Sequence, residues 1–103
     1  MLDSYQCNMI PKKVLIGGHT ITIKYKKVLR HGGSELLGLC DADNLTIWLK
    51  KGMNPDRKKE VFLHESVHMI SDIHGLRLNE KQVNCLGVCI FSLIVNNGIE
   101  LLN

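Results

Sequence analysis

Residues 54–75 read NPDRKKEVFLHESVHMISDIHG. Asn54 before Pro55 is typical of a helix start, because an asparagine side chain caps free backbone N–H groups and proline fits the first helical position. Gly75 is typical of a helix end, since glycine takes the left-handed conformation without a Cβ clash. The apolar residues between these signals follow helical spacing: Phe62, Leu63, Val67, Ile70 and Ile73. We therefore predict a helix over residues 55–74.

This helix carries an HExxH motif, His64-Glu65-Ser66-Val67-His68. Residues four apart in a helix stand on one face, so His64 and His68 can give two imidazole nitrogens to one metal ion. Zinc is the expected ion, because two imidazoles and a third ligand leave a fourth position for water. Glu65 then lies beside the metal, where its carboxylate can accept a proton from that water. The competing interpretation is a pair of core histidines next to a surface glutamate.

Size and composition indicate one globular domain, residues 1–103, with 45% hydrophobic and 22% charged residues. The net charge of +3 is small and the lysines occur in scattered pairs, which disfavours a nucleic-acid partner. The first residues lack the pattern of a signal peptide. The most apolar run, residues 85–95, is too short to cross a bilayer. We therefore expect a cytoplasmic protein without a membrane partner.

The cysteines show neither a CxxC pair nor a disulfide-dense pattern, which fits a cytoplasmic location: Cys7, Cys40, Cys85 and Cys89. Cys85 and Cys89 are four residues apart, so they share a helix face and in principle offer two thiols to a metal ion. Their sequence neighbours are mostly apolar. We therefore predict that both behave as small buried hydrophobic residues.

The first half of the chain has the alternating pattern of β-strands. Ile21, Ile23 and Tyr25 share one face of a strand that follows Gly17-Gly18, which is typical of a hairpin. In chain order we predict strands at residues 14–16 and 20–26, a loop at 30–35, a short strand at 36–40, a turn at 41–44 and a strand at 45–50. These strands predict a small antiparallel, or possibly mixed, sheet.

A second helix is predicted over residues 80–96. Asn79 can cap it, Glu80 in its first turn suits the helix dipole, and Asn97-Gly98 supplies a left-handed stop. Apolar residues lie on nearly all of its faces, so this helix is either deeply buried or in contact with a partner. Gly87 at its middle indicates close approach to a neighbouring backbone. The predicted fold class is α+β: a small sheet followed by two packed helices.

Two histidines alone hold zinc weakly, so a third ligand must follow them. Asp72 is one turn beyond His68 on the same face, and three ligands stacked along one helix cannot surround an ion. His74 is six residues after His68 and points roughly 120° away from it if the helix continues. Glu80 follows a loop and opens the next helix, so its carboxylate can approach from across the helix–helix interface. We predict Glu80 as the third ligand, with His74 as the alternative.

The chain resembles a known group at three places: residues 63–68, Gly75-Leu76 and residues 80–84. There it is similar to the small zincin-like metallopeptidases of phages and prophages. Those proteins are in turn related to the repressor-cleaving proteases of mobile elements and, more distantly, to thermolysin-type gluzincins. The resemblance covers the chain from about residue 41 onward, and the first forty residues match only as a short β-rich lead-in.

The resemblance implies a role for each residue of the site. His64 and His68 would be zinc ligands, Glu65 the general base and Glu80 the third ligand. Gluzincins often carry an aspartate four residues after that glutamate, where it orients a ligand histidine. This chain has Asn84 at that position, which is uncharged but can accept a hydrogen bond.

The same resemblance implies that residues 45–50 form an edge strand that pairs with extended substrate. Trp48 in this strand is expected either to shape the substrate cleft or to be an ordinary core residue. His19 and His31 lie in a hairpin and a glycine-rich loop and are expected at the surface. An alternative role for His31 is to stabilise an oxyanion.

The leading function is a zinc-dependent endopeptidase, phage- or prophage-encoded, acting on a protein or peptide substrate. A non-catalytic, zinc-stabilised protein-binding module is the second possibility, and the small size of the chain favours it. A metal-dependent endoribonuclease using His64, His68 and His74 is the third. That ribonuclease family has Gly where this chain has Glu65 and another Gly where it has Ser71, which weighs against it. Neither the substrate nor the oligomeric state follows from the sequence.

Overall fold

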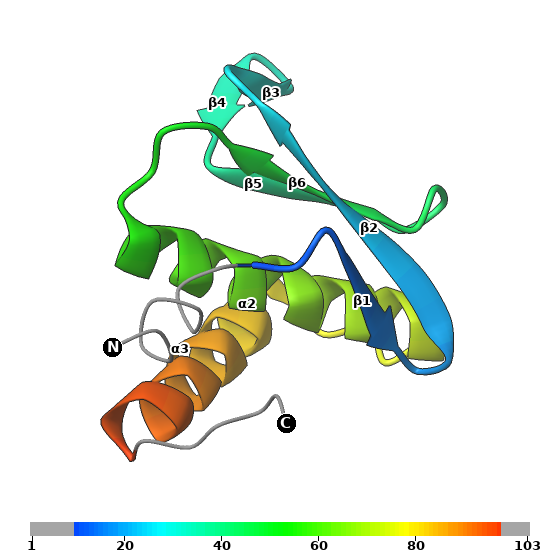
Figure 1. Cartoon of the computed structure of the whole chain (residues 1–103). Coiled ribbons are helices and arrows are strands. Elements are labelled where there is room, and N and C mark those ends of the chain that lie inside the picture. The colour runs from blue at the N-terminus through cyan, green and yellow to red at the C-terminus, as the bar shows by residue number, and fades with distance from the viewer. Residues whose placement is uncertain (1–9, 98–103) are drawn as a thin grey trace.

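The computed structural model describes residues 10–97. Strands come first and helices follow, and the predicted α+β class is confirmed (Figure 1). The elements in chain order are β1 (Lys13–Ile16), β2 (His19–Lys26), β3 (Leu29–His31), β4 (Ser34–Leu36), β5 (Gly38–Asp41), β6 (Thr46–Lys50), α2 (Pro55–His74) and α3 (Glu80–Asn96).

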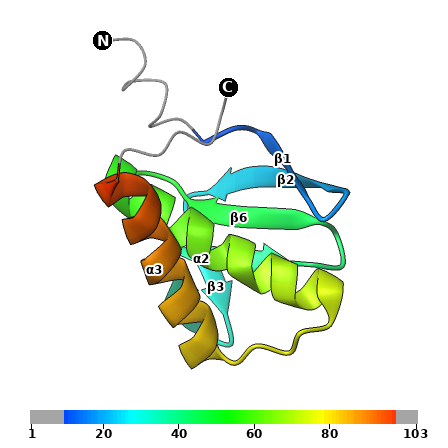
Figure 2. The ribbon, with the colours of Figure 1, turned by 90° about the horizontal axis from the view of Figure 1, so that it is seen from below.

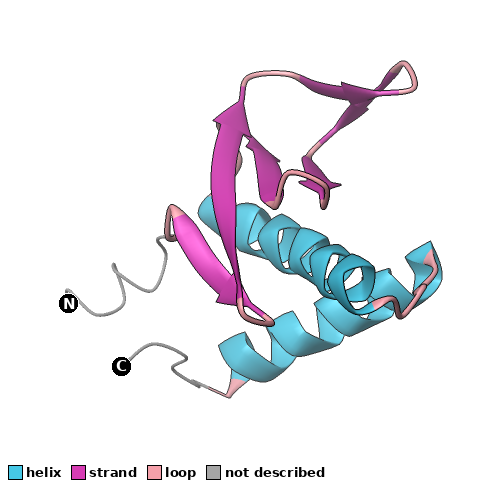
Figure 3. Cartoon of the chain, turned by 90° about the vertical axis from the view of Figure 1, so that its right-hand side faces the viewer, coloured by secondary structure: helices cyan, strands magenta, loops and turns pink. Residues whose placement is uncertain are grey.

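The main sheet has four strands in the order β1-β2-β6-β5. β1 with β2 and β5 with β6 are antiparallel pairs, whereas β2 and β6 run parallel, so the sheet is mixed. α2 lies against one face of this sheet and α3 packs on α2 (Figure 2). The β3–β4 hairpin forms a separate two-stranded sheet that projects on the side away from the helices (Figure 3).

The helix boundaries are close to those predicted. Asn54 Oδ1 accepts hydrogen bonds from the Asp56 and Arg57 N–H groups at 2.8 and 3.5 Å, and Gly75 ends α2 in the left-handed conformation with φ 66°. Asn79 caps α3 in a capping box with Gln82. At the end of α3, Asn97 is not left-handed, since its φ is −115°. Gly98, the second residue of the predicted stop, lies outside the described residues, and so does Cys7.

The loop predicted at residues 30–35 is wrong, because those residues belong to the β3–β4 hairpin. Leu29 pairs with Leu36 and His31 with Ser34 across a Gly32-Gly33 turn. Both glycines have positive φ, 60° and 85°, as a tight two-residue hairpin turn requires. The glycine pair was therefore the turn of a hairpin, and not the sign of a longer loop.

The predicted edge position of residues 45–50 is also wrong. β6 begins at Thr46, since Leu45 has φ 49° and closes the preceding turn. β6 lies inside the sheet, with β2 on one side and β5 on the other, and β5 is the edge strand. The four-residue β5 pairs back onto β6 across the turn, which covers the edge that β6 would otherwise expose.

The core lies between the sheet and α2. The residues that meet there are fully or nearly fully buried: Ile21, Ile23, Ile47 and Leu49 from the sheet, Val61 and Met69 from α2. Ile47 and Leu49 alternate along β6 with Thr46, Trp48 and Lys50, as the period of a strand requires. Trp48 thus belongs to the sheet face opposite the helices, beside the Lys24 and Lys26 ammonium groups.

α3 is much less buried than its composition suggested. Within it only Val83 and Gly87 are buried. The prediction that Cys85 and Cys89 are buried hydrophobic residues is wrong, because both are exposed. Within residues 10–97, α3 packs mainly against α2, and its other sides carry exposed apolar residues. Of the two alternatives for α3, deep burial is excluded and contact with a partner stays open.

Neither helix within residues 10–97 has the length and hydropathy needed to cross a bilayer.

Candidate metal centre

α2 places the two histidines of the motif side by side. Their ring centroids are 5.0 Å apart and the ring planes make an angle of 69°. About a quarter of each side chain is exposed, 25% for His64 and 26% for His68. This arrangement follows from their spacing of four residues on a regular helix, where the two side chains leave from successive turns of one face.

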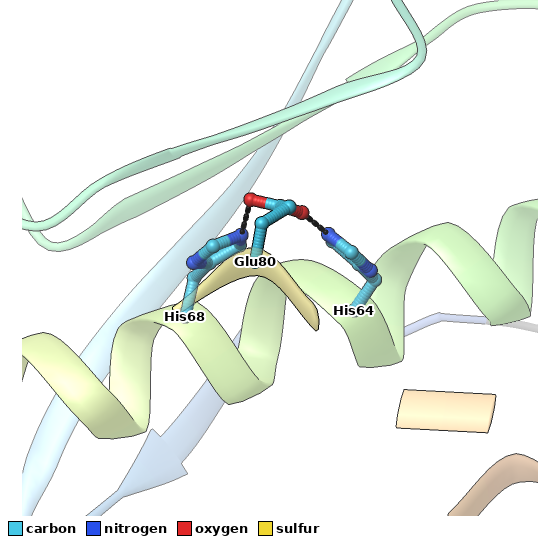
Figure 4. Close-up of side chains that lie close together, drawn as sticks. All are labelled: His64, His68 and Glu80. Atoms are coloured by element: carbon cyan, nitrogen blue, oxygen red, sulfur yellow. Dashed lines mark hydrogen bonds and ion pairs between the residues drawn. The ribbon is translucent and has the colours of Figure 1, made fainter. Parts of the chain in front are cut away.

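Glu80 reaches the histidines from the first turn of α3 (Figure 4). Its Oε1 lies 2.8 Å from His64 Nε2 and its Oε2 lies 3.2 Å from His68 Nε2. The connection between the helices holds it there. The Leu78 N–H donates to Ser71 Oγ at 3.0 Å, and the capping box fixes the start of α3 at Asn79.

One atom from each of His64, His68 and Glu80 lies within 4.8 Å of the other two, and among the described residues these three form the only such group. Ligand bonds of about 2.0–2.2 Å in a tetrahedral zinc site place neighbouring ligand atoms about 3.3–3.5 Å apart. The observed 2.8 and 3.2 Å separations run to the two different oxygens of Glu80 and are hydrogen-bond distances, so Glu80 must move outward for an ion to enter between it and the histidines. Two nitrogens and one carboxylate oxygen fit zinc, although other divalent metals accept the same set.

Glu65 lies beside this group and is buried, with 9% of the residue exposed. Burial raises the pKa of its carboxyl group to about 7, from an ordinary 4.5. His64 lowers the pKa and Glu80 raises it, but both effects are smaller than that of burial. A carboxylate with a pKa near neutrality can both accept and release a proton at physiological pH.

A cavity of about 570 Å³ opens over these residues. β5 and the segment leading into it form one wall, with Leu36, Leu37 and Leu39, and α3 forms the other, with Asn84 and Val88. His64, Glu65 and His68 lie between the two walls. A smaller cavity of about 190 Å³ adjoins Glu65 and His68 and is lined by Cys40 and Asp72.

The other candidate residues lie apart from this centre or at its margin. His74 lies against the β1–β2 turn, where its Nε2 is 2.6 Å from the position that a Cβ on Gly17 would take. Asp72 Oδ2 accepts a weak hydrogen bond from Cys40 Sγ at 4.0 Å. Asn84 borders the cavity. Trp48 is not among the residues that line it, so the expected role in a cleft is not supported.

His19 and His31 are exposed, as expected, at the start of β2 and the end of β3. Neither residue lines the cavity over the metal centre. The alternative role for His31 in stabilising an oxyanion thus has no support in this geometry.

Both walls of the site have a glycine that faces α2, and at Gly38 the close approach leaves no room for a Cβ. At Gly38 in β5, a Cβ would lie 2.6 Å from Val61 Cγ1 and 3.0 Å from Glu65 Cγ. At Gly87 in α3, a Cβ would lie 3.4 Å from the His64 Cα. The close approach predicted at Gly87 is confirmed. Gly38 was missed, although a glycine inside a strand is a known signal of close backbone approach.

Gly38→Ala is expected to lower the free energy of unfolding by about 1–3 kcal/mol, because its Cβ would overlap the stiff side chain of Val61. Gly87→Ala is the matched control. Its Cβ would make an ordinary contact, and alanine favours a helix over glycine by about 1 kcal/mol, so stability should not fall. Urea unfolding of the two variants measures the difference. Equal stabilities would show that β5 does not depend on the small residue.

The raised pKa of Glu65 predicts a pH-dependent stability of the metal-free protein. Because the folded-state pKa is above the ordinary value, folding favours the protonated carboxyl group. That contribution is fully present below about pH 4.5 and is lost as the pH rises through about 7. Relative to Glu65→Gln, metal-free wild type should lose on the order of 3 kcal/mol over this range. Chemical unfolding of both metal-free proteins from pH 4 to pH 8.5 tests this prediction. If the free energies of unfolding of wild type and Glu65→Gln changed with pH in the same way, the raised pKa of Glu65 would be contradicted.

Comparisons with protein-family models, curated proteins and solved structures find no match for this chain.

Proposed function

We propose that the chain is a zinc-dependent endopeptidase of the zincin type that hydrolyses peptide bonds in a protein or peptide substrate. One observation carries the proposal: a carboxylate from α3 meets both motif histidines beside a buried glutamate of raised pKa. Two imidazoles and one carboxylate that converge in this way are the donor set of a catalytic zinc site, and Glu65 lies where a general base is needed. The phage or prophage origin that the resemblance implies stays a prediction.

In this proposal His64, His68 and Glu80 hold the ion. When bound, zinc activates a water molecule and polarises the substrate carbonyl. Glu65 accepts the proton from the attacking water and delivers it to the leaving amine. Gly38 lets β5 pack closely against the Glu65 side chain, which holds the carboxyl group beside the three ligands.

β5 supplies the surface on which an extended peptide can align. Within the described sheet it pairs with β6 alone, so its second edge has backbone N–H and C=O groups to offer. The adjoining segment forms a wall of the cavity over Glu65. Main-chain pairing of this kind holds a peptide in an extended conformation whatever its side chains are. The role assigned to residues 45–50 thus passes to residues 38–41.

The ribonuclease ligand set is not assembled in this structure. His74 lies at the far end of α2 against Gly17, while His64 and His68 meet Glu80. An arrangement of three histidines would require α2 to turn soon after His68, yet α2 continues to His74. We therefore do not propose that function.

Metal analysis combined with a cleavage assay tests the peptidase proposal. Purified protein should contain about one zinc ion per chain and should cleave members of a mixed peptide library. A chelator should abolish cleavage and added zinc should restore it. Zinc binding without cleavage of any library member, including unfolded whole proteins, would instead favour the non-catalytic protein-binding module.

A further inference from the structure

α3 carries an apolar surface that neither the core nor the metal centre explains. Leu86, Leu93 and Val95 are 42, 56 and 49% exposed, and none of them lines the cavity over the metal centre. From residue 82 to residue 97 the chain has no charged side chain. Exposed apolar surface without interspersed charge is uncommon on soluble monomers and is typical of interaction sites.

The exposed residues on one flank of α3 follow the repeat of paired helices. They are spaced by four, three, four and three residues, and we call them the α3 seam: Gln82, Leu86, Cys89, Leu93 and Asn96. All five are exposed. This spacing keeps one side of a helix in contact with a second helix along its length. The apolar members lie at the centre of the seam and the amide side chains at its two ends.

The α3 seam faces away from the metal centre. Leu93 is nine residues after Asn84, which places it about 180° around the helix from a residue that lines the cavity. The side of α3 that packs against α2 is different again, and it carries the buried residues Val83 and Gly87. A partner on the seam would therefore leave the cavity and the β5 edge open.

The charge of the surface indicates which partner fits the seam. The chain has a net charge of +3, so two copies repel each other over most of their surfaces. The seam has no charged residue, so two copies can meet there without like-charge repulsion.

The order of residues in the seam is almost the same in both directions about Cys89. Leu86 is three residues before it and Leu93 four residues after it, while Gln82 and Asn96 are each seven residues away. In an antiparallel pair of α3 helices, Leu86 of one copy faces Leu93 of the other and the amide ends meet. Antiparallel helices also place opposite ends of their dipoles together.

We propose that the α3 seam joins two copies of this chain as an antiparallel, two-fold symmetric dimer with Cys89 nearest the axis. The proposal does not rest on the peptidase function. A helix of 17 residues is about 25 Å long and about 10 Å wide, so each copy buries an area well below the roughly 800 Å² of a standard interface. The dimer should therefore be weak and should dissociate on dilution.

Sedimentation equilibrium over a concentration series tests the dimer. Wild type should pass from monomer to dimer as its concentration rises into the high micromolar range. Leu93→Glu should remain monomeric, because two glutamates would be buried at the seam. Val95→Glu introduces the same charge at an exposed residue of the same helix but off the seam, so it should dimerise like wild type. A monomeric wild type, or equal behaviour of the two variants, would overturn the proposal.

Thiol cross-linking gives a second test that needs no charged substitution. Oxidation of the dimer by copper phenanthroline and dioxygen should join the two Cys89 thiols as a disulfide. The two Cys85 residues would be eight helical positions apart, about 12 Å along the axis, too far for a disulfide. Cys85→Ser should keep the cross-link and Cys89→Ser should lose it, with the linked peptides identified by mass spectrometry. A cross-link that survives Cys89→Ser and depends on Cys85 would overturn the antiparallel arrangement.

Discussion

Glu65→Gln is expected to retain zinc and to lower peptide hydrolysis by roughly 10²–10⁴-fold. Glutamine has nearly the same shape as glutamate but cannot take a proton from water. Glu65 does not belong to the group formed by His64, His68 and Glu80, so the three ligands stay in place. The loss should appear in kcat, because proton transfer belongs to the chemical step, while KM changes little.

Asp56→Asn is the matched control for this experiment. It makes the same change from carboxylate to amide on the same helix, at a side chain that is 84% exposed and outside the cavity. Its activity should equal that of wild type. Equal rates for Glu65→Gln and wild type would show that Glu65 is not the general base. Loss of zinc from Glu65→Gln would make Glu65 a ligand or a structural residue instead.

The helices could be predicted because their signals are local. The Asn54 cap, the Gly75 stop and the spacing of apolar residues act within a few turns of one helix, and the structure follows them closely. The pairing of His64 with His68 is local for the same reason. The approach of Glu80 crosses the helix–helix interface, and it could be anticipated because a short loop brings the start of α3 back beside α2.

The arrangement of the sheet was harder to predict than the helices, because strand pairing joins residues that are distant in sequence. Period-two alternation located β6 and its buried face, but it gives no information on which strands flank it. The expected edge position of residues 45–50 rests on the resemblance to zincins, and it is wrong, because β5 occupies the edge beside α2. Gly38 was overlooked for a related reason, since its close neighbours Val61 and Glu65 are supplied by another element.

The wrong prediction that Cys85 and Cys89 in α3 are buried follows from the apolar composition of this helix. A helix with apolar residues on all faces is either buried in its own domain or covered by a partner. The sequence pattern of the helix is the same in both cases, so it cannot distinguish them. Only the geometry separates them: α3 meets α2 through Val83 and Gly87 and leaves Cys85 and Cys89 at the surface. The same observation that corrects the cysteine prediction is the one that supports a second copy of the chain as partner.

Glu80→Ala is expected to lower zinc affinity by at least about 100-fold, whereas His74→Ala should leave it within a few-fold of wild type. Glu80 contributes the one carboxylate that meets both motif histidines, at 2.8 and 3.2 Å, and its negative charge offsets part of the charge of the ion. The His74 ring is packed against Gly17 at the other end of α2. Competition titration with a zinc chelator measures both affinities, and circular dichroism confirms that each variant is folded.

If His74→Ala lost zinc while Glu80→Ala kept it, the ion would be held by a set of histidines that this fold does not bring together. The peptidase proposal would then fail with the ligand assignment, because the cavity, Glu65 and the β5 edge all adjoin Glu80 and lie apart from His74.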